Sequence, residues 1–264
     1  MNENETLLKN YDSISEDVKF VSKSLIRLKI LAALFEESQT MKSLTEKTSL
    51  SYSSISSAIH SLELKGYVFR ESNKYFLSNN MKLYMNYVLE FKSIVNLLNK
   101  FFNILDGHVV TMIPNQSVYE LYLLGNAKLL ESDGVDVYKI YNYIENAINE
   151  AENLKCILPF FYDDFNNALN ALVDKGAFVE VMVPEDIYET FEEKSEIRYL
   201  SSFDGDERFL LIVSDKIMIL GLFKNNGFFD QNRLLTSKNS DAIEWANNLF
   251  KNFKNKNKWV LDYL

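Results

Sequence analysis

Cysteine and histidine are scarce in this chain of 264 residues, which narrows the chemistry that it can perform. The single cysteine, Cys156, excludes an internal disulfide and a cysteine-cluster metal site, and its apolar neighbours favour a buried structural thiol over a redox switch. Neither histidine, His60 or His108, has a partner at the spacing of a metal ligand set or a catalytic triad. We therefore expect no metal site and no catalytic residues.

Glycine-rich nucleotide motifs and long apolar runs are also missing. The eight glycines form neither a P-loop nor a Gly-x-Gly-x-x-Gly pattern, so we expect no cofactor. The longest apolar runs, residues 209–213 and 217–223, fall far short of the roughly 18 residues of a membrane span. The first residues are acidic and polar and lack a signal-peptide pattern. These absences predict a cytoplasmic protein without a membrane partner.

The most specific pattern that is present spans residues 40–77. Thr40 and Ser51 stand where they can cap two short helices, and Gly66 ends the second helix. Two segments with period-two alternation follow around a polar turn and predict a hairpin. The second helix has one apolar face, formed by Ile55, Ile59 and Leu62. Two helices followed by a hairpin indicate a winged helix-turn-helix, in which the second helix reads the major groove of DNA.

The exposed side of this second helix carries small or polar groups that fit against a DNA groove, and two cations lie at the tip of the wing, where they can meet phosphates. The predicted DNA-binding residues are Lys42, Ser51, Tyr52, Ser53, Ser56, Ser57, His60, Arg70 and Lys74. The alternative is a small α+β module that binds a protein partner instead of DNA.

A further helix is expected to begin at Ser15 or Asp17 and to precede this pattern. Its basic residues Lys23, Arg27 and Lys29 could contact phosphates, although a solvated face is the simpler role. Its buried stripe is expected to contain Phe20, Leu25, Leu28, Leu31, Ala32 and Phe35.

The net charge of −9 is unevenly distributed. Residues 17–84 contain ten Lys/Arg against six Asp/Glu, whereas residues 85–264 contain seventeen against twenty-seven and residues 1–16 contain one against four. The segment with the winged-helix pattern is therefore the positive one, and binding to nucleic acid depends on such local charge.

A long helix is predicted over residues 78–105, and it carries two apolar rows. The first row follows spacings of four and three: Tyr84, Val88, Phe91, Val95, Leu98, Phe102 and Leu105. The second row lies beside it: Tyr87, Ile94, Leu97, Phe101 and Ile104. This width exceeds what one partner helix needs, so we expect one row to pack on its own chain and the other to form a homodimer. In the alternative, both rows pack within the monomer.

Strand and helix patterns alternate in the rest of the chain and predict an α/β domain with a mixed sheet. Expected strands are residues 108–113, 154–158, 178–183, 197–200, 208–213 and 217–223. Expected helices are residues 117–124, 137–151, 163–175, 185–193 and 241–253. Ligands of open α/β sheets bind beyond strand ends, which makes Phe161, Tyr162 and Asp163 the candidate ligand-binding residues. Packing in the core is the alternative role for these aromatic residues.

Along most of its length the chain resembles the archaeal winged-helix transcription regulators of the methanogenesis regulatory protein family. The resemblance rests on the winged helix and on the order of short segments at residues 144–147, 154–158, 213–215 and 221–223, Gly227, Asp230 and residues 241–250. It implies a transcription regulator whose C-terminal domain has a fold similar to that of the archaeal sugar-responsive regulators and phospholipase D-like proteins. The His-x-Lys motif of phospholipase D catalysis is absent.

The expected fold class is an α+β winged helix-turn-helix, a long connecting helix and an α/β mixed-sheet sensor domain. The expected domains are residues 1–77 for DNA binding, 78–106 for connection and dimerisation, and 107–264 for sensing. The expected function is sequence-specific binding of double-stranded DNA by a dimeric regulator that a small-molecule effector or partner controls. A protein-binding winged helix and a hydrolase with an accessory winged helix are the alternatives.

Overall fold

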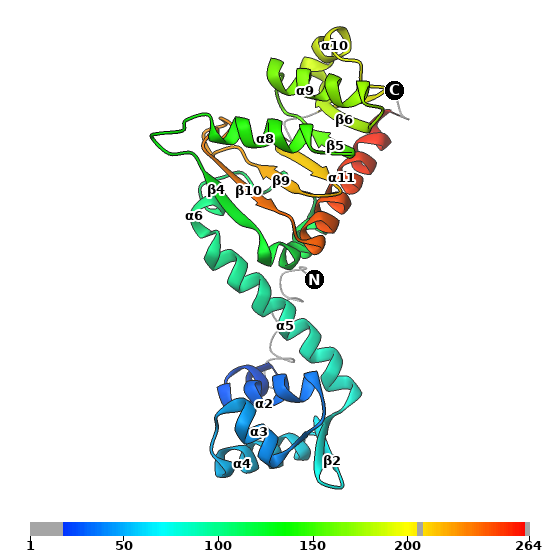
Figure 1. Ribbon diagram of the computed structural model, residues 1–264. Helices are drawn as coiled ribbons and strands as arrows, with labels where there is room; N and C mark the ends of the chain where they lie inside the picture. The colour runs from blue at the N-terminus through cyan, green and yellow to red at the C-terminus, as the bar shows by residue number, and fades with distance from the viewer. Residues whose placement is uncertain (1–17, 205–207, 262–264) are drawn as a thin grey trace, which may run out of the picture. The chain divides into compact units, whose positions relative to one another are not determined.

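The structure is a computed structural model that describes residues 18–204 and 208–261. Two compact units make up the chain, Met1–Phe91 and Lys92–Leu264 (Figure 1). The boundary falls inside helix α5 (Asn79–Lys100), so this helix contributes to both units. The three-part division at residues 77 and 106 stays a prediction.

The first unit has the element order of a winged helix-turn-helix. Its elements are α2 (Leu25–Glu36), β1 (Gln39–Thr40), α3 (Met41–Thr48), α4 (Tyr52–Leu64), β2 (Val68–Glu71) and β3 (Lys74–Leu77). The strands form an antiparallel sheet in the order β1-β3-β2. The two predicted helices and the hairpin are confirmed, and β1 is an additional strand that pairs along the hairpin.

Local hydrogen bonds explain where the two helices begin. The Thr40 hydroxyl accepts a hydrogen bond from the Ser43 amide at 3.1 Å, and the Ser51 hydroxyl accepts one from the Ser54 amide at 3.2 Å. Each hydroxyl satisfies an amide that the first helical turn leaves without a partner. Between the helices Ser49 has a φ of 58°, the left-handed conformation that commonly ends a helix, and it caps the carboxyl end of α3.

The helix before this pair differs from the expectation. Helix α2 begins at Leu25, because Ser24 caps it by accepting a hydrogen bond from the Arg27 amide at 3.3 Å. A separate helical stretch covers residues 18–22, and the predicted starting points Ser15 and Asp17 lie outside the described residues. The cap places Leu25 on the surface with 67% of its area exposed, so its predicted burial is wrong.

Helix α5 is followed by a short second helix. The Ser78 hydroxyl accepts a hydrogen bond from the Met81 amide at 3.3 Å and caps α5. Phe101, with φ of −112° and ψ of 17°, leaves helical geometry and separates α5 from α6 (Phe102–Leu105). The predicted helix over residues 78–105 is therefore present with one break.

The second unit is built on a mixed sheet of seven strands in the order β4-β10-β9-β8-β5-β6-β7. Strands β5, β6 and β7 are parallel, and the other pairings are antiparallel. The strands are β4 (Lys128–Glu131), β5 (Asn153–Ile157), β6 (Phe178–Pro184), β7 (Tyr199–Phe203), β8 (Leu210–Ser214), β9 (Met218–Gly221) and β10 (Arg233–Ser237).

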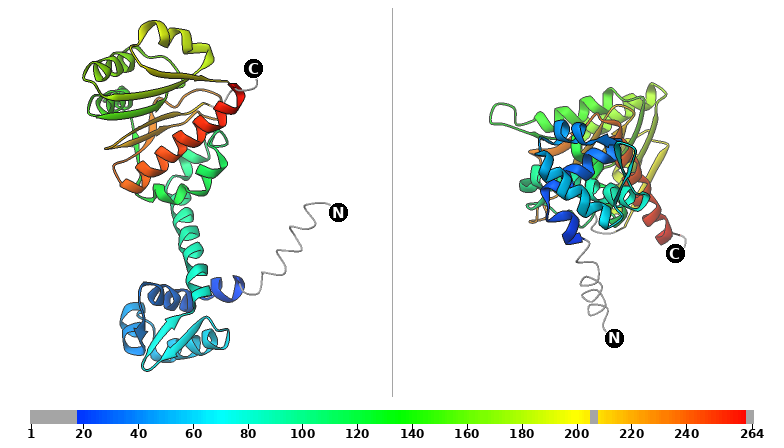
Figure 2. Two further views of the ribbon diagram at one scale, coloured as in Figure 1. Left: turned by 90° about the vertical axis from the view of Figure 1, so that its right-hand side faces the viewer. Right: turned by 90° about the horizontal axis from the view of Figure 1, so that it is seen from below.

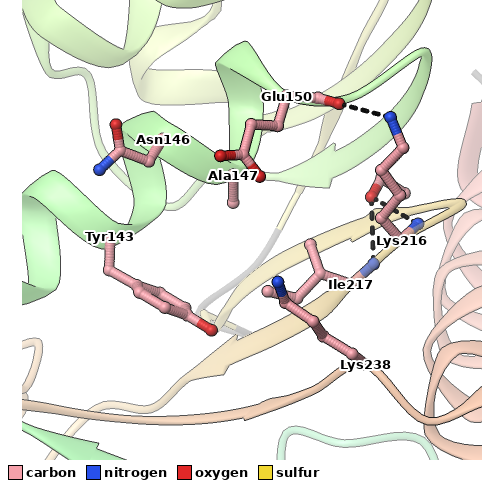
Figure 3. Close-up of a pocket in the computed structure, with 8 residues that line it drawn as sticks. Tyr143, Asn146, Ala147, Glu150, Lys216, Ile217 and Lys238 are labelled. Atoms are coloured by element: carbon pink, nitrogen blue, oxygen red, sulfur yellow. Dashed lines mark hydrogen bonds between the residues drawn. The ribbon is translucent and has the colours of Figure 1, made fainter.

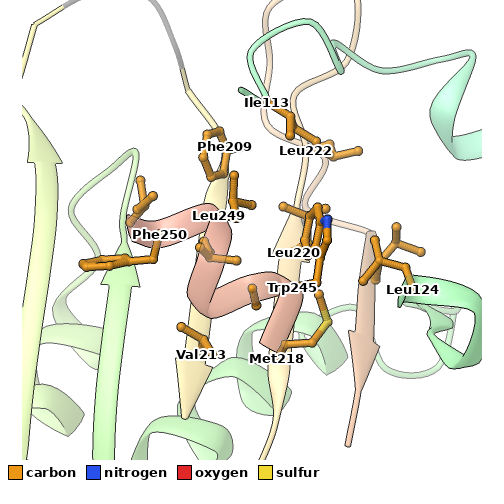
Figure 4. Close-up of a cluster of buried hydrophobic side chains, with 14 of the residues drawn as sticks. Ile113, Leu124, Phe209, Val213, Met218, Leu220, Leu222, Trp245, Leu249 and Phe250 are labelled. Carbon is orange, nitrogen blue, oxygen red and sulfur yellow. The ribbon is translucent and has the colours of Figure 1, made fainter. Parts of the chain in front are cut away.

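Helices cover both faces of this sheet (Figures 1 and 2). They are α7 (Asn115–Tyr119), the 3-10 helix η1 (Leu121–Asn126), α8 (Lys139–Asn149), α9 (Asp163–Asp174), α10 (Glu185–Lys194) and α11 (Ser240–Leu261). Alternate residues of β8 enter two cores: Leu211 and Val213 face α11, whereas Leu210 and Ile212 face α8 and α9. Trp245 of α11 lies in the first core (Figure 4) and donates its indole hydrogen to the Ser117 carbonyl at 2.8 Å.

Two parts of the predicted sheet are corrected. The expected strand at residues 108–113 forms only an isolated bridge between His108 and Lys224, because the chain turns at Ile113 and has no neighbouring strand among the described residues to extend the ladder. Strands β4 and β10 are additions to the predicted set, and together they extend the sheet beyond β9.

Gly221 at the end of β9 allows a close ring contact. A Cβ at this position would lie 2.8 Å from two ring carbons of Phe229 and 3.3 Å from Leu210 Cβ. The Phe229 ring also packs against Phe160 and Phe223, at centroid distances of 4.9 and 5.5 Å, and has little room to move.

We predict that Gly221→Ala lowers the free energy of unfolding of the second unit by about 1–3 kcal/mol, because the added methyl overpacks this ring cluster. Urea unfolding followed by tryptophan fluorescence measures the effect, since both tryptophans belong to this unit. Gly125→Ala is the control, because a methyl group added there would have no atom within 4 Å and the backbone is not left-handed. Equal stability of the two variants would contradict the prediction.

Candidate nucleic-acid interface

Helix α4 has one buried face and one exposed face. Ile55, Ile59 and Leu62 are at most 2% exposed and join α4 to the core of the first unit. The predicted contact residues lie on the opposite side and are exposed: Tyr52, Ser53, Ser56, Ser57 and His60. The structure therefore brings these five side chains together on one polar surface of the helix.

Ser51, the remaining predicted residue at this end, has a structural task. Besides accepting the Ser54 amide, its hydroxyl lies 2.8 Å from the Ser54 hydroxyl and 3.1 Å from the Ser53 hydroxyl. This network of hydroxyls surrounds the amino end of a helix of 13 residues. Helix amino ends carry partial positive charge, so the network lies where a DNA phosphate would be stabilised.

The wing presents Arg70 and Lys74 on its exposed surface. The Arg70 Nε donates to the Ser72 carbonyl at 3.0 Å, and its guanidinium carbon lies 5.6 Å from the centre of the Tyr75 ring. These contacts hold the side chain and leave its terminal nitrogens available to an anion. Lys74 lies opposite Glu71 across the hairpin, and the turn between them passes through Ser72, whose φ is 54°.

The cations of the first unit differ in what they contact. Lys47 is paired with Glu37 at 3.0 Å and Glu36 at 3.5 Å, and its hydrogen bond lowers the pKa of the Glu37 carboxyl. Lys42 is exposed near the start of α3, and within the part of the chain that the structure describes its ammonium group pairs with no acidic side chain. Lys42 is therefore available to a phosphate, whereas Lys47 is not.

A hollow of about 550 Å³ lies beside α4. Its lining residues are Ser24, Ile26, Arg27, Ser53, Ser54, Ser57, Ala58 and Ser61. Arg27 stacks at 3.9 Å on the ring of Phe20, and its buried Nε has no hydrogen-bond partner among the described residues. Ser61 is absent from the predicted contact residues, although it continues the four-residue spacing of Ser53 and Ser57.

The basic residues expected on the preceding helix have different surroundings. Lys23 is exposed, as a solvated face requires. Arg27 is half-buried against Phe20, and the Lys29 ammonium donates to the Thr48 carbonyl at 3.4 Å. Arg27 and Lys29 therefore help to hold the first unit together.

In the second unit the predicted ligand-binding residues lie within an aromatic cluster at the start of α9. Phe161 packs edge-on against Phe191 at 4.9 Å, and Tyr162 packs in the same way against Phe165 at 4.9 Å. Asp163 forms an ion pair with Lys194 at 3.7 Å. The structure places the three residues side by side, with each side chain in contact with another part of the unit.

A cavity of about 360 Å³ lies elsewhere in this unit, between α8 and the strands (Figure 3). Its lining residues are Tyr143, Asn146, Ala147, Glu150, Ser214, Lys216, Ile217 and Lys238. The Tyr143 hydroxyl lies 3.1 Å from the Thr236 hydroxyl, and the Lys216 ammonium donates to the Glu150 carbonyl at 3.0 Å. No sequence pattern predicts this cavity, because its residues come from three separate segments.

Residues that could support metal or thiol chemistry are dispersed. Among the described residues, no group of three or more His, Cys, Asp or Glu side chains is placed to hold a metal ion. Burial raises the pKa of the Cys156 thiol, which disfavours its reactive thiolate form. No helix in the described ranges is both long and apolar enough to cross a bilayer.

Two family models match the chain. The N-terminal domain of the methanogenesis regulatory protein FilR1 matches residues 15–99, and the middle domain of the same protein matches residues 137–256. The curated protein FilR1 of Methanothrix harundinacea (strain 6Ac) is 20% identical over 167 residues. This match covers 58% of the chain and 37% of the relative, so the similarity extends over little more than a third of that protein.

Solved structures show weaker similarity. The archaeal chromatin protein TrmBL2 aligns with a TM-score of 0.37 and 13% identity, covering 93% of this chain and 98% of that one. The phospholipase D family member Nuc from Salmonella typhimurium aligns with a TM-score of 0.35 and 12% identity, covering 49% of this chain and 91% of that one. Similarity at this level adds nothing to the fold described above.

We predict that Ser51→Ala speeds hydrogen exchange of the α4 amides about fivefold, because loss of an N-cap costs about 1 kcal/mol of local stability. Hydrogen exchange with mass spectrometry on the full chain measures this effect. Ser56→Ala is the matched control, since its exposed hydroxyl makes no hydrogen bond within the described part of α4. Unchanged exchange in Ser51→Ala would show that its hydroxyl does not stabilise the helix.

Proposed function

The chain belongs to the archaeal methanogenesis regulatory protein family, and we propose from this premise that it is a transcription regulator whose first unit binds double-stranded DNA. The exposed polar face of α4 carries the proposal. A helix in this position of a winged helix-turn-helix enters the major groove, where small side chains permit close approach. The family consists of regulatory proteins, which argues against the hydrolase alternative.

The exposed side chains are assigned distinct roles. The residues on the exposed face of α4 contact base edges: Ser53, Ser56, Ser57 and His60. Lys42 and Tyr52 position the helix on phosphates, and Arg70 and Lys74 anchor the wing. Serine hydroxyls both donate and accept hydrogen bonds, so they discriminate weakly between bases, and DNA shape supplies part of the sequence preference.

The proposal is tested by selecting binding sites from random double-stranded DNA and titrating the selected sequence at several salt concentrations. We expect an enriched sequence whose affinity falls as salt rises, because phosphate contacts release counterions. A folded protein that enriches no sequence would contradict the proposal and favour a winged helix that binds a protein partner.

We predict that Arg70→Ala weakens binding to selected and random DNA alike and reduces the slope of log affinity against log salt by about 1, as expected for one lost phosphate contact. Fluorescence anisotropy with both DNAs measures this effect. Lys47→Ala removes the same charge but should have little effect, since Lys47 is paired with two glutamates.

We predict a different result for Ser56→Ala, which removes a contact to a base. Its affinity for the selected sequence should fall by about 1 kcal/mol, whereas its affinity for random DNA and its salt slope should not change. An equal loss on both DNAs would refute the assignment of Ser56 to base recognition.

We also propose that the protein is a homodimer through α5. Leu97, Phe101 and Ile104 of the second row are at most 2% exposed, so this part of the row packs on its own chain. Part of the first row remains on the surface: Phe91 (68% exposed), Val95 (37%), Leu98 (43%) and Phe102 (61%). Along α5 the spacings of four and three from Phe91 to Leu98 match a helix that pairs with a second copy, and Phe102 continues the row at the start of α6.

Dimerisation has a functional consequence. Two winged helices related by a twofold axis bind two half-sites of a near-palindromic sequence. An effector that binds the second unit could change DNA affinity by favouring one relative arrangement of the two winged helices. It must bind that arrangement more tightly than the other to do so.

We predict that Phe91→Asp converts the dimer to a monomer, because it places a charge in the apolar seam. Analytical ultracentrifugation measures the mass in solution. Phe228→Asp is the matched control, since Phe228 is 73% exposed and lies outside α5. A monomeric wild-type protein would refute the proposed dimer. It would not decide whether the protein binds DNA, which the selection from random DNA tests separately.

A further inference from the structure

A buried carboxylate, Asp230, organises a second cavity in the second unit. Only 1% of its side chain is exposed, and its two oxygens are surrounded by donors. His108 Nε2 and Arg233 Nε both lie 2.8 Å from Oδ2, whereas the Asn232 amide donates to Oδ1 at 3.1 Å and the Lys224 ammonium lies 3.4 Å from the same oxygen. Asp230 is therefore fully engaged as an acceptor.

The ionised form of Asp230 is favoured by these contacts. Burial alone raises the pKa of the carboxyl, but hydrogen bonds from His108, Asn232 and Arg233 outweigh burial and hold its pKa below the usual range. The other nitrogen of His108, Nδ1, faces the Ile104 carbonyl. The ring thus lies between two acceptors, and it donates to both only when it carries its second proton.

One of the donors around Asp230, the Arg233 guanidinium, is only partly used by that contact. Arg233 contacts Asp230 through Nε, and its two terminal nitrogens have no hydrogen-bond partner among the described residues. Its side chain is 29% exposed, and that of Lys224 is 36% exposed. A guanidinium held through Nε presents a preformed pair of donors, the geometry that recognises an oxyanion.

Both cations line a cavity of about 390 Å³, whose lining residues are Glu131, Ser132, Lys224, Asp230, Asn232 and Arg233. The Ser132 hydroxyl is buried and has no hydrogen-bond partner within the described residues. A buried hydroxyl without a partner costs free energy, which a ligand that accepts its hydrogen would recover. The two cations and the unsatisfied Ser132 hydroxyl together form a donor set for an anion.

We propose that this cavity binds the oxyanion group, phosphate or carboxylate, of a small molecule. The donors outnumber the remaining acceptors, because Asp230 is occupied by its own partners and Glu131 is the one other carboxylate among the described residues that line the cavity. For the proposed regulator, this site indicates that the effector is a small molecule with an oxyanion group. That regulatory role rests on the proposed function, whereas binding of the anion does not.

The experiment is isothermal titration calorimetry of the full chain with inorganic phosphate and, separately, with acetate, against sodium chloride as the control for ionic strength. We expect saturable binding of at least one anion, and the tighter one identifies the oxyanion. Arg233→Gln should weaken binding about tenfold or more, since it removes charge-assisted hydrogen bonds. Ser132→Ala should weaken it severalfold, and it leaves the partners of Asp230 intact if Arg233→Gln fails to fold.

Two further variants test where the anion binds. Glu131→Gln should strengthen binding severalfold, because it removes a negative charge that repels an anion in this cavity. Lys238→Gln removes a cation from the cavity shown in Figure 3 and should leave binding unchanged. The proposal is overturned if neither anion binds saturably, if Arg233→Gln and Ser132→Ala bind as the wild type does, or if Lys238→Gln loses binding equally. DNA affinity is measured in a separate experiment, so that failure of anion binding can be told apart from failure of the proposed DNA binding.

Discussion

Burial of one face of α4 is the constraint on which the first unit depends. Ile55, Ile59 and Leu62 can enter the core together only in one rotation of the helix about its axis. That rotation turns the serines and His60 outward, and the Ser51 cap sets where the helix begins. The hydrophobic effect therefore selects the surface that is left for the proposed contact with DNA, although none of the buried side chains belongs to that surface.

The second unit is likewise organised by burial of apolar side chains, here on both faces of a sheet. Alternate residues of β8 enter two separate cores, so this strand is buried on both faces, and polar groups gather where strands end. Asp230 and Arg233 lie at such an end, where β10 begins next to the end of β9. A buried carboxylate at this strand end needs donors, and two of them, Lys224 and Arg233, also line the proposed anion site.

Helix α5 belongs to both units and has two apolar rows. Its beginning packs through Met81 and Met85 into the core of the first unit, and its end packs through Leu97 into the core of the second unit that contains Trp245. The exposed part of the first row is left over after these contacts are made. An apolar surface of this kind on a helix is typical of an interaction site, which supports the proposed homodimer.

Local patterns by themselves determined the winged helix, the start of α5 and most strands and helices of the mixed sheet, because caps, turns and periodicity act over a few residues. They also identified the exposed face of α4, since its residues share one helix. They failed for residues 108–113, where the apolar pattern of a strand had no neighbour to pair with among the described residues. They also failed for β4 and β10, because strands of four and five residues carry little periodic signal. Only the tertiary structure brought His108, Ser132 and Arg233 around Asp230, because contacts between residues far apart in sequence depend on how the strands are ordered in the sheet.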